Sequence, residues 1–98
     1  MTDSIDTILD ERAARYGKFT DHARLTYSIK REMRQFQRQA ETAPRAWDGL
    51  AYDQHEALEM IAHKIGRILN GDPDYADSWV DIAGYATLVA KRLQGEAK

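Results

Sequence analysis

The apolar residues of this chain recur at intervals of three and four, and no segment alternates with a period of two for long enough to form a strand. Such spacing gathers apolar side chains on one side of a helix. It predicts four helices, over about residues 3–14, 20–40, 53–69 and 74–93. A connector over residues 41–49 contains Pro44 and Gly49. We therefore expect an all-α fold in one domain over residues 1–98, a small bundle of three long helices and one short N-terminal helix, completed by oligomerisation.

Local signals predict where these helices begin and end. Gly17 is expected to end the first helix, Thr20 or Asp21 to cap the second, and Asn70 with Gly71 to end the third. The fourth helix is apolar almost all round, which is typical of a helix buried on most sides. The apolar stripes of the second and third helices are expected to form the core: Leu25, Ile29, Met33, Phe36, Leu58, Ile61, Ile65, Ile68 and Leu69.

Composition excludes several classes of protein. The chain has no cysteine, so disulfides and cysteine-based zinc sites are impossible. No run of about 18 apolar residues is present, which argues against a membrane span, and the acidic, polar first residues do not resemble a signal peptide. We expect a soluble, cytoplasmic protein. A domain of this size buries a modest fraction of its surface, which favours a homo-oligomer.

The distribution of charge is more informative than its sum. The net charge of −2 argues against a general nucleic-acid binder. Residues 24–45 nevertheless carry a net charge of +4, which leaves −6 for the rest of the chain. This basic stretch is either a solvated helix face or a patch for phosphates or an acidic protein partner. Few aromatic residues are interleaved with it, which argues against direct reading of DNA. The candidate partner-binding residues are Lys30, Arg31, Arg34 and Arg38.

Two acidic pairs are the strongest candidates for a functional site. Glu56 and Glu59 lie three apart on the third helix, and Asp77 and Asp81 lie four apart on the fourth, so each pair shares a helix face. Carboxylates of this kind can hold Mg²⁺, which polarises a phosphoryl group and activates water. Lys64 and Arg67 could bind the remaining phosphate oxygens.

Structural interpretations of the same residues stay open. The two glutamates, with His63 and Arg67, could form a solvated face opposite Leu58 and its apolar neighbours. Asp77 could stabilise its helix, because a carboxylate in the first turn interacts favourably with the helix dipole. Asp81 lies deeper and could form a structural ion pair with Lys64 or Arg67, because a carboxylate on a buried helix needs a partner.

The segment from Glu56 to Tyr85 resembles MazG-like all-α nucleoside triphosphate pyrophosphohydrolases, which carry two acidic pairs on consecutive helices. It is still more similar to small phage-encoded proteins described as MazG-like. In those, a K-x-x-R motif precedes a D-S-W-x-D-x-A-G-Y string, here Lys64, Arg67 and residues 77–85. Residues 11–19 are also similar to their opening. The resemblance implies a dimeric or tetrameric bundle and Mg²⁺-dependent cleavage of a nucleoside triphosphate to the monophosphate and pyrophosphate. The implied metal ligands and catalytic residues are Glu56, Glu59, Asp77 and Asp81.

One departure from that pattern leads to the alternatives. The second acidic pair consists of two aspartates four apart, where a longer glutamate is expected, and one missing methylene displaces a carboxylate from near-ideal Mg²⁺ geometry. The alternative is a non-enzymatic phage protein that acts against host defence. It would bind a component of a CRISPR–Cas or other immune system, or sequester a signalling nucleotide. A third hypothesis is a self-assembling module whose fourth helix is buried in an oligomer.

Overall fold

The computed structural model describes residues 2–37 and 45–96 and confirms the all-α fold. The helices are α1 (Thr2–Tyr16), α2 (Phe19–Gln35), α3 (Tyr52–Asn70) and α4 (Ala76–Leu93), and a short 3-10 helix, η1 (Ala46–Gly49), precedes α3. The extended pairing seen in these described ranges is one isolated bridge between Gln37 and Arg45. None of the helices described is both long and apolar enough to cross a membrane.

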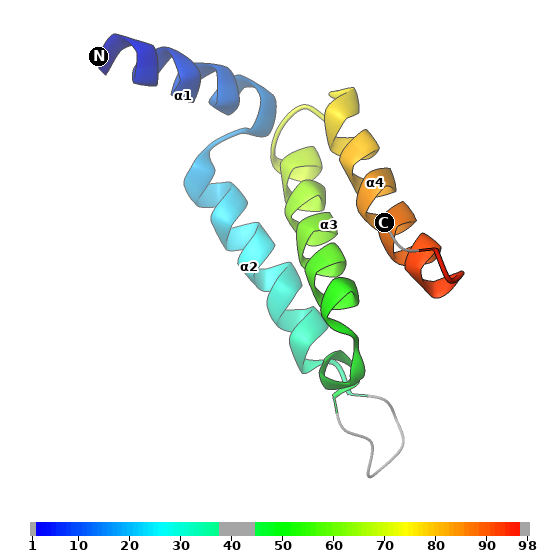
Figure 1. The fold of residues 1–98 in the computed structure, drawn as a ribbon. Coiled ribbons are helices and arrows are strands. Elements are labelled where there is room, and N and C mark those ends of the chain that lie inside the picture. Colours follow the sequence, from blue (N-terminus) through cyan, green and yellow to red (C-terminus); the bar gives the residue numbers. More distant parts are fainter. Residues whose placement is uncertain (1, 38–44, 97–98) are drawn as a thin grey trace.

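Three of the helices form a single layer. Helices α2, α3 and α4 lie side by side with α3 in the middle, while α1 projects from the end of the layer near the start of α2 (Figure 1). Among the described residues, α3 packs mainly against α2 and α4 on its two flanks, so large parts of the two broad faces of the layer are open.

Some predicted helix boundaries are wrong. Helix α2 begins at Phe19 after Lys18, which makes no side-chain cap, so neither Thr20 nor Asp21 caps it. It ends at Gln35 because Phe36 turns to ψ 126°, whereas the pattern predicted an end near residue 40, outside the described residues. Helix α1 has 15 residues and is close in length to the others, although a short helix was expected. The predicted ends of α1 and α3 at Gly17 and Asn70 are confirmed.

Two glycines let the turn between α1 and α2 lie directly on the end of α3. Gly17 adopts φ 77°, which glycine tolerates without steric cost. The Asn70 side-chain amide donates hydrogen bonds to the carbonyls of Tyr16 (2.9 Å) and Lys18 (3.0 Å). A Cβ at Gly71 would overlap the backbone of Tyr16. Close backbone contact therefore fixes this turn against α3.

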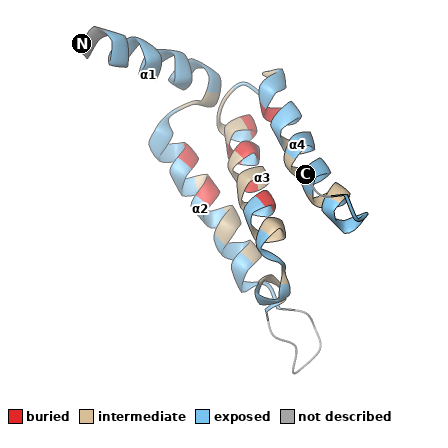
Figure 2. Cartoon of the chain, viewed as in Figure 1, coloured by how far each residue is buried: buried red, intermediate tan, exposed pale blue. Residues whose placement is uncertain are grey.

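The core consists of small and polar residues. The buried apolar residues are Ala57, Ala62 and Ile68, and the buried polar ones are His22, Thr26, Lys64 and Ser78 (Figure 2). The predicted core was therefore largely wrong, since of its members only Ile68 is buried. The physical reason is the layer itself: helix neighbours cover the flanks of α3, where its small residues lie, and leave its apolar stripe on an open face.

That stripe forms a broad apolar face of the layer. Leu58 and Ile61 of α3 line the same shallow cavity as Ala86 of α4, so the apolar sides of the two helices face the same way. Helix α4 was expected to be buried on most sides, and this prediction is wrong. Trp79 is 55% exposed, and Ser78 alone among the residues of α4 is buried. We call the following residues the apolar face: Leu58, Ile61, Ile65, Leu69, Trp79 and Ala86.

Candidate functional site

The candidate site residues gather on the opposite face of the layer. On α3, Glu56, His63 and Arg67 lie opposite the apolar stripe. Glu56 shares a cavity with Leu88 of α4, which places the Asp81 side of α4 on the same face. We call the following residues the polar face: Lys30 and Arg34 of α2, Glu56, Glu59, His63 and Arg67 of α3, and Asp77 and Asp81 of α4.

Lys64 and Asp81 connect α3 to α4. The Lys64 Nζ atom lies 2.9 Å from Oδ2 of Asp81, and the Lys64 side chain is only 10% exposed, against 47% for Asp81. A buried ammonium is costly unless it is paired, so the small exposed fraction of Lys64 depends on this carboxylate. The structural ion pair that the sequence left open is thus the arrangement observed. Arg67 has no part in it.

The other carboxylates of the polar face have separate surroundings. Glu59 is paired with Arg34 of α2. Asp77 accepts a hydrogen bond from the Tyr75 hydroxyl at 2.9 Å, and this contact raises the pKa of Tyr75 because ionisation would remove the donor. Glu56 is exposed.

Among the described residues, the carboxylates of the polar face are spread out rather than clustered. In the part of the chain that the structure describes, no three histidine, aspartate or glutamate side chains lie close enough together to hold a metal ion. Glu56, Glu59, Asp77 and Asp81 share one face, but Arg34, Tyr75 and Lys64 engage three of them separately.

A pair of histidines between α2 and α3 was missed as a unit by the sequence analysis. The His22 Nε2 and His63 Nδ1 atoms lie 3.4 Å apart, and the two rings meet edge to face. Thr26 contacts His22 from the next turn of α2. Gly66 allows this close approach, because a Cβ there would overlap the Thr26 hydroxyl. The sequence offered one signal for this contact. His22 and Thr26 lie four apart, so they share a side of α2, and Thr26 directly follows Leu25 of the apolar stripe.

The histidine pair lies in a positive environment. Burial, followed by the charge of Arg67, lowers the pKa of His63 to about 4, and His22, Lys30 and Lys64 add to the effect. Burial also lowers the pKa of His22. Both rings are therefore neutral at pH 7. Among the described residues, neither Lys30 nor Arg67 has a carboxylate within ion-pairing distance.

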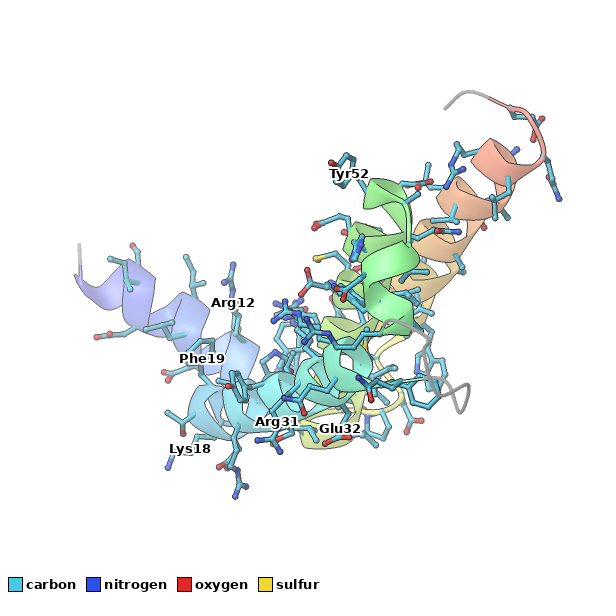
Figure 3. All side chains as sticks on the ribbon, turned by 90° about the horizontal axis from the view of Figure 1, so that it is seen from below. Arg12, Lys18, Phe19, Arg31, Glu32 and Tyr52 are labelled. Atoms are coloured by element: carbon cyan, nitrogen blue, oxygen red, sulfur yellow. The ribbon has the colours of Figure 1, made fainter. Side chains whose placement is uncertain are left out.

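A pocket of about 440 Å³ lies beside these histidines, where α1 meets α2 and α3. The Arg67 guanidinium lies 4.0 Å from the centroid of the Tyr16 ring, which forms one wall. Arg12 and Phe19 line the pocket at the junction of α1 and α2 (Figure 3). None of the described residues that line the pocket is acidic.

Three of the predicted partner-binding residues, Lys30, Arg31 and Arg34, lie on α2. Lys30 and Arg34 belong to the polar face, whereas Arg31 is exposed and lies within 4.0 Å of its neighbour Glu32. Figure 3 shows the Arg31 and Glu32 side chains next to each other on α2. Arg38 lies outside the described residues.

The fold and these contacts define an all-α protein in which a three-helix layer carries one polar and one apolar face. A family profile described as a domain of unknown function, DUF6378, matches residues 1–93, so the chain belongs to that family. Neither the curated proteins nor the solved structures include a match to the chain.

Proposed function

We propose that this protein binds a nucleotide at its polar face, on a MazG-like scaffold that does not itself catalyse hydrolysis. One observation carries the proposal. Lys30 and Arg67 are half-buried cations without a carboxylate partner among the described residues, and their charges help to lower the pKa values of both neighbouring histidines. An unpaired positive potential of this kind favours an anion, and guanidinium and ammonium groups suit phosphate oxygens.

The pairing of the carboxylates supports binding rather than catalysis. If Asp81 became a metal ligand, the metal would compete with the buried ammonium of Lys64 for the charge of this carboxylate. At Glu59 the metal would likewise compete with Arg34. The present arrangement therefore does not fit the Mg²⁺ site that the resemblance implies, and we assign no step to a metal.

Mg²⁺-dependent hydrolysis of a nucleoside triphosphate to the monophosphate and pyrophosphate is the second candidate. It is favoured by the position of all four carboxylates on one open face, beside the cations Lys64 and Arg67. In that case Glu56, Glu59, Asp77 and Asp81 would hold the metal.

A panel of nucleoside triphosphates with and without Mg²⁺ separates the two candidates. We expect saturable binding by calorimetry and no pyrophosphate release. Turnover that requires Mg²⁺ and is lost in both Asp81→Asn and Glu59→Gln would refute the non-catalytic proposal and support hydrolysis. The absence of both binding and turnover would refute both candidates.

A role against host defence is the biological function we propose for such a binder. A non-catalytic nucleotide site could sequester a signalling nucleotide, and this follows from the same unpaired cations. A component of a CRISPR–Cas or other immune system is the alternative partner, bound through Lys30, Arg31, Arg34 and Arg38. Arg31→Glu, which reverses a charge away from the polar face, should leave nucleotide affinity unchanged, and it would weaken capture of a protein partner if one binds there.

We further propose that two or more copies associate through the apolar face. The chain has an accessible surface of 7422 Å², against about 5,700 Å² expected for a folded monomer of 11.2 kDa. Its radius of gyration is 16.5 Å, whereas about 13 Å is expected for 98 residues. The excess area is about twice the roughly 800 Å² that each partner buries in a standard interface.

Sedimentation analysis of variants tests this association. Ile65→Glu and Leu58→Glu place a charge on the apolar face and should shift the protein toward monomer. Leu88→Glu places the same charge on the polar side of α4 and is the matched control. A wild-type chain that sediments as a monomer at every concentration would refute the proposal.

A further inference from the structure

The polar face leaves open where a nucleotide would lie, and the pocket between α1, α2 and α3 has the most specific chemistry for it. Its walls combine two guanidiniums, Arg12 and Arg67, with the aromatic rings of Tyr16 and Phe19. Its volume of about 440 Å³ falls in the range of about 300–1,000 Å³ that is usual for small-ligand sites.

The charges of the lining select the class of ligand. Among the described residues of the lining, the ionisable side chains are arginine, histidine and tyrosine, and none is a carboxylate. Arginine presents a planar set of donors that matches a phosphate group. Phe19 is 77% exposed and stands at the pocket, so an apolar ring there is available for stacking. Together these features match a phosphate joined to a flat ring system.

The histidine pair provides a further polar group at the same place. Within the described residues, His63 contacts His22 through Nδ1 and has no hydrogen-bond partner for Nε2. His63 lines the pocket beside Arg67. An anion in the pocket would therefore meet a neutral imidazole that can accept a proton.

Building on the nucleotide binding proposed above, we propose that this pocket is the nucleotide site: Arg12 and Arg67 bind a phosphate, and Tyr16 and Phe19 flank the base. Helix α1 supplies Arg12 and Tyr16 and so forms one side of the site. Binding is coupled to proton uptake at the histidine pair, because an anion beside an imidazole favours its charged form.

The groups that face the pair are known on each element around it. Arg12 comes from α1, Lys30 from α2, and Lys64 and Arg67 from α3. The charges of Lys30, Lys64 and Arg67 oppose protonation of His63. A bound phosphate would offset that repulsion, so it should raise the pKa of His63.

The probe for this site is adenosine 5′-monophosphate, with orthophosphate and adenosine as its two halves. Binding is followed by NMR of the histidine and tyrosine rings in the full chain. We expect the monophosphate to bind more tightly than either half, to shift the ring signals of Tyr16 and His63, and to raise the pKa of His63 above its value in the free protein.

Variants then separate this pocket from the rest of the polar face. Arg12→Gln should lower the binding affinity for the monophosphate by about tenfold or more, because a charged hydrogen bond is lost. Arg24→Gln removes the same charge from an exposed position outside the pocket and should change affinity little. Circular dichroism confirms that both variants keep their helix content.

The outcomes distinguish this inference from the proposal on which it rests. If Arg34→Gln abolishes binding while Arg12→Gln has no effect, the polar face binds nucleotide but the pocket does not hold it. If the Arg12 and Arg24 variants weaken binding equally, net charge is responsible and the pocket assignment is wrong. If no probe shifts any of these rings, the pocket assignment is wrong, and the calorimetric panel of triphosphates decides whether the polar face binds nucleotide at all.

Discussion

The close contact between α2 and α3 at Gly66 leads to a prediction whose sign depends on two opposing effects. In Gly66→Ala, the new methyl group would overlap the Thr26 hydroxyl and lie 3.1 Å from the His22 ring. Overpacking of this kind costs about 1–3 kcal/mol. Replacing a glycine inside a helix by alanine favours folding by about 0.8–1 kcal/mol. We therefore expect the free energy of unfolding to fall by about 1 kcal/mol, because the cost of overpacking this rigid contact exceeds the gain in helix propensity.

Gly84 of α4 provides the matched control. A Cβ at Gly84 has no atom within 4 Å, so Gly84→Ala should keep the whole propensity gain of about 0.8–1 kcal/mol. The difference between the two variants then isolates the cost of the close approach, about 1–3 kcal/mol. Urea denaturation followed by far-ultraviolet circular dichroism measures both free energies, at one fixed protein concentration because association would shift them.

A second substitution checks the cause. Thr26→Ala removes the hydroxyl that the new methyl group would meet, so the double variant with Gly66→Ala should lose less stability than the two single effects added together. Equal stabilisation by Gly66→Ala and Gly84→Ala would refute the reasoning, since it would mean that α2 and α3 are not in contact at this position.

Three further predictions concern single contacts. Asp81→Asn should lower the free energy of unfolding by about 1–2 kcal/mol, because it leaves a buried ammonium unpaired and the exposed side of the carboxylate moderates that penalty. The control Asp77→Asn should lower it by under about 0.5 kcal/mol, and equal losses in urea titrations would contradict this. Stability should fall as the pH decreases from about 6.5 toward 4, because the unfolded chain binds protons that His22 and His63 resist in the folded state, and His63→Asn should flatten that slope in thermal melts. Asn70→Ala removes two hydrogen bonds to the turn after α1 and should cost about 1–2 kcal/mol, with faster amide exchange in α1 than in α4; unchanged exchange in α1 would count against this role.

The polar face shows how much of the site could be predicted from sequence. Helical spacing alone placed Glu56, His63 and Arg67 opposite Leu58, and the structure has the same two-faced helix. Helical spacing could not show which partner each charged side chain binds, because such partners can be distant in the chain. Arg34, for example, binds Glu59, which lies 25 residues away in the sequence. His22 and His63 are 41 residues apart, and no local sequence motif around either histidine predicts their contact.

The core shows the same division. Apolar spacing correctly identified helices, but it predicted Leu58 and Ile65 as core when both lie on an open face. Whether an amphipathic helix buries its apolar stripe depends on where its neighbours lie, and that is a tertiary property. Here α2 and α4 cover the flanks of α3, so Ala57 and Ala62 are buried instead.

By itself, the sequence determined the helical class, the ends of α1 and α3, and the residues that share a helix face, because these depend on local backbone preferences and on a period of 3.6 residues. Only the tertiary structure decided the rest. It arranged three helices of the small bundle in one layer, paired Asp81 with Lys64, and brought α1 against the histidines to form a pocket. Those outcomes depend on contacts between residues distant in sequence, which no local pattern specifies.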